Sequence, residues 1–109
     1  MSAVLFLAQR VTAAILAFLV VVHLSMIIAA EHAGLTAGAI LSRTHHNLLL
    51  LAFYTLFVVA ASIHAPIGLR NVIAEWAGWR GRSLDFAISA FALALLGLGL
   101  RAVLAVYSA

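Results

Sequence analysis

The chain has 109 residues, of which 67% are hydrophobic and only 8% are charged. A soluble domain is about half apolar and about one quarter charged, so this composition argues against a water-soluble globular fold. Cysteine is absent, which excludes disulfides, thiolate metal sites and cysteine-ligated iron–sulfur clusters in this chain. The net charge of +3 comes from six scattered arginines without a lysine, so we expect no basic face and no nucleic-acid partner. The length fits a single domain over residues 1–109.

The predicted elements are three apolar helices. They cover residues 4–30, 47–69 and 84–107, and each has the ~20 residues needed to cross ~30 Å of hydrocarbon. The runs are continuously apolar rather than alternating, which favours helices over a barrel. The first run is also longer than the 7–15 apolar residues that are typical of a cleaved signal peptide. We therefore expect an all-α membrane protein whose three transmembrane helices form part of a bundle with another membrane chain.

The arginines are unevenly distributed around the predicted spans. The first connection, residues 31–44, contains only Arg43. Four arginines lie near the N-terminus or around the second connection, residues 71–83: Arg10, Arg70, Arg80 and Arg82. Because cytoplasmic segments carry an excess of positive charge, we expect the N-terminus and the second connection to face the cytoplasm.

His64 lies near the end of the second span, and an ionisable residue inside lipid is a candidate functional residue. It precedes Arg70 by six residues, or about 9 Å of helix. A neutral imidazole is a common metal ligand, so His64 could hold a haem iron. Gly68 follows one turn later on the same face, where a missing side chain would leave room for a flat macrocycle. A hydrogen bond to a neighbouring helix explains His64 equally well, and the residues alone do not decide between the two.

His23 is the second histidine inside a span, 13 residues after Arg10 and roughly 20 Å deep. At ~100° per residue, the polar residues of this helix share one face, which we expect to be turned toward protein. That face consists of Gln9, Thr12, Leu16, Leu19, His23 and Ile27. His23 would lie ~10 Å farther from the cytoplasm than His64, so we expect each to need a ligand from another chain. The alternative for His23 is a hydrogen bond to a backbone carbonyl.

Two further histidines are expected at the outer interface. His46 precedes His64 by 18 residues, which places it on the same face of the second helix. We interpret His46 and its neighbour His45 as a solvated interfacial pair.

Hydrogen-bond donors gather near the start of the first span. Gln9, Arg10 and Thr12 could donate to a haem propionate or to a quinone carbonyl. Arg101 interrupts the third span near its outer end. It either extends to the lipid headgroups or pairs with an acidic group such as a haem propionate.

Two stretches resemble the cytochrome b anchor subunits of succinate dehydrogenase. Residues 9–13, Gln-Arg-Val-Thr-Ala, are similar to the His-Arg-x-Ser/Thr-Gly run that opens the first helix of that family. Residues 64–76 are similar to the family's His-x3-Gly-x-Arg-His-x3-Asp stretch at the end of the second helix. The chain departs from the family pattern at five positions, which here are Phe6, Gln9, Ala13, Asn71 and Glu75.

The resemblance implies a membrane anchor that holds a flavoprotein subunit and an iron–sulfur subunit at a bacterial inner membrane. Electrons from succinate would reach a quinone near the cytoplasmic interface, beside a haem b. His64 matches the family's haem ligand, and Arg10 matches an arginine near the propionates and the quinone. Members with two haems imply that His23 ligates a second, distal haem. A second membrane chain, or a second copy of this one, would supply the opposite ligands.

Taken together, these arguments give two sets of site residues. The expected cofactor-binding residues are His64, His23, Arg10, Gly68, Arg70 and Arg101. The expected quinone-binding residues are Arg10, Gln9 and Thr12. Two alternatives stay open: a haem-free structural anchor of the same complex, and a b-type anchor of another membrane oxidoreductase. A small transporter is disfavoured, because no acidic residue lies inside a span and no inverted repeat is visible.

Overall fold

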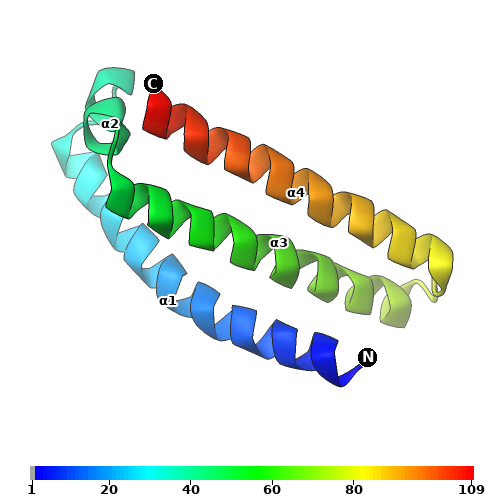
Figure 1. Cartoon of the computed structure of the whole chain (residues 1–109). Coiled ribbons are helices and arrows are strands. Elements are labelled where there is room, and N and C mark those ends of the chain that lie inside the picture. Colours follow the sequence, from blue (N-terminus) through cyan, green and yellow to red (C-terminus); the bar gives the residue numbers. More distant parts are fainter. Residues whose placement is uncertain (1) are drawn as a thin grey trace.

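The computed structural model describes residues 2–109 and contains four helices in that range, without a strand. They are α1 (Ala3–Ala33), α2 (Ala37–Thr44), α3 (Leu48–Trp76) and α4 (Arg82–Ser108) (Figure 1). Three of them, α1, α3 and α4, are long and apolar enough to cross a membrane. The expectation of an all-α membrane protein with three spans is therefore confirmed.

Side-chain caps explain where three of the helices begin. Ser2, Thr36 and Asn47 precede α1, α2 and α3, and each accepts a hydrogen bond from a backbone N–H in the first turn of its helix. Such caps satisfy donors that have no partner inside the helix. α1 ends at Gly34, whose φ of +122° is a conformation that side chains rarely adopt, so the chain can turn there toward α2.

The helices extend beyond the predicted spans. α1 runs to Ala33 and α3 runs to Trp76, so the second connection shrinks to residues 77–81, while the first contains α2. Hydropathy marks where the chain leaves hydrocarbon, but a helix can continue into the interface wherever its own hydrogen bonds are kept. The placement of His46 on the second helix was wrong. It precedes the Asn47 cap and has a positive φ of 51°.

α3 lies between α1 and α4, and both pack along it (Figure 1). The closest approach involves Gly99 of α4, where an added Cβ would lie 2.6 Å from Cγ1 of Val58. α2 lies at the end of the molecule where α4 finishes, and the Thr44 hydroxyl donates to the carbonyl of Val106 at 3.1 Å. The N-terminus lies at the opposite end.

Few side chains are buried by this arrangement. The buried hydrophobic residues are Leu19, Ala60, Leu84 and Val103. Large apolar side chains elsewhere on α1, α3 and α4 are exposed, with Phe18 at 70% and Phe86 at 80%. Surfaces of this kind need lipid or another apolar chain around them. The structure is thus that of a multi-pass membrane protein.

Candidate functional site

His64 lies against α1, where its partner is Thr12. The Thr12 hydroxyl is 3.3 Å from Nδ1 of His64 and links two residues that are 52 positions apart in the sequence. Thr12 is only 5% exposed, so α1 and α3 enclose this contact. The hydrogen bond to a neighbouring helix that the sequence offered for His64 is therefore present.

The hydrogen bonds of Thr12 favour one tautomer of the neutral imidazole. The Thr12 hydroxyl has one proton. Its oxygen lies 2.7 Å from the carbonyl oxygen of Ala8, and the hydroxyl donates to that carbonyl. Toward His64 the same oxygen can then only accept, so Nδ1 carries the ring proton. Nε2 keeps its lone pair, and it makes no hydrogen bond within residues 2–109. A histidine whose Nδ1–H is held by a neighbouring acceptor is the usual form of a metal-ligating histidine.

A groove runs beside His64 along α1 and α3. Its volume is about 420 Å³, and its lining is mostly apolar. Three alanines contribute to it, Ala17 from α1 and Ala61 and Ala65 from α3. Small side chains spaced by four residues leave a shallow trough on a helix, and Leu16, Val20 and Phe57 line the rest of this groove.

Gly68 has a different neighbour from the expected one. An added Cβ on Gly68 would lie 3.3 Å from Nε2 of Gln9, so the Gln9 amide occupies the space that the glycine leaves. Oε1 of Gln9 is buried and has no hydrogen-bond partner in the described part of the chain. Gly68 thus allows α1 to approach α3, and it does not line the groove beside His64.

The three residues expected at a quinone do not point to one place. Thr12 is buried against His64, Gln9 lies over Gly68, and Arg10 is exposed. The Arg10 guanidinium carbon lies 5.6 Å from the centre of the Phe6 ring, as in a cation–π contact. Arg10 is therefore the member of this set that a membrane-soluble ligand can reach.

Arg70 forms an ion pair with Asp85 in the first turn of α4. Its Nε lies 2.8 Å from Oδ1 of Asp85, and the two side chains are 30% and 55% exposed. Sequence reasoning missed this pair, although an acidic residue in the first turn of a helix is a recognisable signal. One nitrogen of Arg70 is thus used to join the ends of α3 and α4.

His23 lies among aromatic rings of α3. Its ring contacts Phe53, Tyr54 and Phe57, and its Nδ1 is 3.4 Å from the Tyr54 hydroxyl. These positions precede His64 by seven to eleven residues, or roughly 10–16 Å of helix. The two histidines therefore lie at different depths, as the sequence predicted, and they do not share a site.

The protein-facing stripe of α1 is largely confirmed. Thr12 and Leu19 are buried, and Gln9, Leu16 and His23 are half-buried. Ile27 departs from the pattern, because 47% of it is exposed.

The other predicted residues lie at surfaces. Arg101 is exposed on α4. His45 and His46 are exposed as expected, and their ring centres are 3.9 Å apart. Within residues 2–109, no group of three or more His, Cys, Asp or Glu side chains could hold a metal ion. An iron ligated by His64 would thus need its remaining ligands from a macrocycle and a partner chain.

Sequence reasoning missed the alanines beside His64. Their spacing was readable, because Ala61, Ala65 and Gly68 follow one another at helical intervals on the side of α3 that carries His64. Comparison of the chain with protein-family models, with curated proteins and with solved structures gave no match.

Proposed function

We propose that the chain is a membrane anchor of a succinate dehydrogenase-type complex, which holds haem b through His64 and serves electron transfer to a membrane quinone. The observation that carries this proposal is the contact between Thr12 and His64. It leaves Nε2 of His64 free to ligate, and His64 lines a mostly apolar groove between α1 and α3. A bound haem b would supply one-electron transfer between an iron–sulfur subunit and the quinone.

The residues of this chain would bind and orient that group. His64 would ligate, Thr12 would hold the imidazole in the ligating tautomer, and the alanine-lined groove would exclude water from one side. A second axial ligand would come from another membrane chain or from a second copy. A two-fold axis along the membrane normal would bring the His64 residues of two copies to equal depth.

Arg10 is the residue that we propose for the quinone or for a propionate. Its guanidinium is exposed and offers several N–H donors, which suit a carbonyl or carboxylate oxygen. We assign Thr12 to His64 rather than to the quinone, because its hydroxyl is buried and already bonded. The roles of Arg70 and Arg101 near a propionate stay predictions.

Purification in mild detergent tests the proposal. A flavoprotein and an iron–sulfur subunit should co-purify with the chain, and the reduced-minus-oxidised spectrum should show a b-type haem. Different co-purifying subunits would indicate another oxidoreductase. A complex without either soluble subunit and without haem would contradict the proposal.

A haem-free anchor of the same complex is the second candidate, and one contact favours it. The Gln9 amide fills the space over Gly68, where the family resemblance leads one to expect a cofactor. Both soluble subunits without a haem signal would establish this alternative.

A second haem on His23 stays a prediction. Three aromatic rings surround this imidazole, which supports a packing role for it. Counting haem per flavin decides the matter, because the flavin counts complexes. Two haems per flavin, falling to one in His23→Leu, would establish the distal site, whereas one haem that is unaffected by the change would exclude it.

The orientation in the membrane can be tested separately. Because the chain has no cysteine, single probes at Gly38→Cys and Arg80→Cys report without background. An impermeant thiol reagent added from outside should label position 38 and not position 80. The reverse pattern would overturn the cytoplasmic placement of His64.

A further inference from the structure

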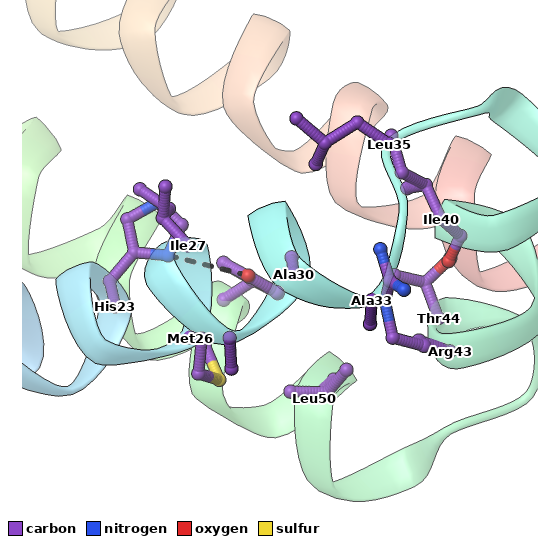
Figure 2. Close-up of a pocket in the computed structure, with 12 residues that line it drawn as sticks. His23, Met26, Ile27, Ala30, Ala33, Leu35, Ile40, Arg43, Thr44 and Leu50 are labelled. Atoms are coloured by element: carbon purple, nitrogen blue, oxygen red, sulfur yellow. Dashed lines mark hydrogen bonds between the residues drawn. The ribbon is translucent and has the colours of Figure 1, made fainter.

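A second cavity, of about 480 Å³, lies between α1, α2 and α3 at the end of the molecule far from His64. Its walls are almost entirely apolar, with Met26, Ile27 and Ala30 from α1 among them. Figure 2 shows His23 and Met26 at one end of this cavity, and Arg43 and Thr44 at the other. The volume is in the range of ligand-binding pockets.

Arg43 brings a permanent positive charge to the cavity. Its Nη2 donates to the carbonyl oxygen of Gly34 at 2.8 Å, which accounts for one of its five N–H donors. Within residues 2–109, the guanidinium makes no other hydrogen bond and has no acidic partner. The half-buried Arg43 guanidinium therefore lacks a counter-charge. Phosphate is an anion that a guanidinium binds well.

The cavity extends along the last turns of α1. α2 joins the ends of two spans, so Arg43 lies where the chain leaves the membrane. His23 precedes the last residue of α1, Ala33, by ten positions, or about 15 Å of helix. The cavity therefore runs from the headgroup level into the hydrocarbon, with the cation at its outer end.

We propose that this cavity binds an anionic phospholipid. The phosphate would lie on Arg43, and one acyl chain would follow α1 inward toward His23. A phosphate accepts the parallel N–H donors of a guanidinium, so an anionic phospholipid headgroup suits this position. A zwitterionic lipid also carries a phosphate, but its ammonium cancels the net charge of the headgroup. Arg43 therefore favours a headgroup with a net negative charge.

Native mass spectrometry of the purified, delipidated protein tests this proposal. The probes are dioleoyl phosphatidylglycerol and dioleoyl phosphatidylcholine, which have the same acyl chains and differ in headgroup charge. We expect about fivefold stronger retention of phosphatidylglycerol, as one arginine near an anionic headgroup provides. Arg43→Gln should remove this preference, whereas the control Arg82→Gln, on an exposed arginine at the start of α4 and far from the cavity, should keep it.

A second variant tests the apolar part of the site and leaves the hydrogen bond from Arg43 to the Gly34 carbonyl in place. Ala30→Leu adds bulk inside the cavity and should weaken retention of both lipids. Equal retention of the two lipids by the unmodified protein would overturn the proposal. So would an unchanged preference in Arg43→Gln, or an Ala30→Leu variant that retains lipid as before.

Discussion

The two sides of α3 are built differently. On the α1 side, polar contacts bridge the helices at Thr12 and at His23, and cavities of about 420 and 480 Å³ lie along the interface. On the α4 side, Gly99 closes against Val58, and the cavity near Tyr107 measures only about 10 Å³. A cavity of about 270 Å³ remains at the other end of these helices, beside Arg70 and Asp85.

We infer that the α3–α4 interface and the α1–α3 interface serve different purposes. Close packing of small against branched residues holds transmembrane helices together, because lipid offers no hydrophobic driving force between them. The α3–α4 interface does this around Gly99 and near Tyr107, where it leaves no room for a ligand. The α1–α3 interface is less closely packed, and its polar groups and cavities are where we propose that a haem and a lipid bind.

The largest effect of a substitution should come from His64, on the α1 side of α3. We expect His64→Leu to abolish or greatly alter the b-type haem signal, because Nε2 is the ligating atom that we propose. Optical spectra and a redox titration of the purified complex measure this. His32→Leu is the control, since His32 is exposed and bonds only within α1. An unchanged spectrum in His64→Leu would refute the assignment.

A smaller effect is expected from Thr12, which orients His64 without touching the iron. Thr12→Val keeps the shape but removes the acceptor of the Nδ1 proton, and loss of such a partner typically lowers metal affinity by about 10–100-fold. Haem retention and midpoint potential are the measurements. Thr12→Ser should restore both toward the unmodified values. A Thr12→Val variant with unchanged haem affinity and potential would mean that the contact is only packing.

Two glycines of α4 test how closely the α4 side of α3 is packed. Gly99→Ala places a Cβ against Val58, and overpacking of this kind costs about 1–3 kcal/mol. Gly97→Ala meets nothing within 4 Å, so the free energy of unfolding should change by no more than ~1 kcal/mol. Unfolding in mixed detergent micelles measures both. Equal stability of the two variants would show that the α3–α4 contact is not tight.

The smallest effect should come from the ion pair between Arg70 of α3 and Asp85 of α4. Arg70 and Asp85 are both partly exposed, so Arg70→Gln should lower the free energy of unfolding by at most ~1 kcal/mol. The loss should shrink further at high salt, because screening weakens exposed pairs. A haem spectrum that changes in Arg70→Gln would instead place Arg70 near the cofactor.

The sequence alone determined the three membrane helices and much of what faces protein on α1. Lipid cannot satisfy free backbone groups, so long apolar runs must be helical, whatever surrounds them. The polar residues Gln9, Thr12 and His23 marked the inner face of α1, because exposing them to hydrocarbon is costly. The separate depths of His23 and His64 followed from the rise per residue.

Only the tertiary structure decided which side chains meet. The bond between Thr12 and His64 and the ion pair between Arg70 and Asp85 depend on how each helix is rotated about its axis. Hydropathy does not specify that rotation where a helix is apolar all round, as it is along most of α3 and α4. The same holds for the cavity at Arg43, which is formed where α2, packed against the end of α4, meets α1 and α3. Rotation and approach are set by contacts between helices, and those contacts join residues far apart in the sequence.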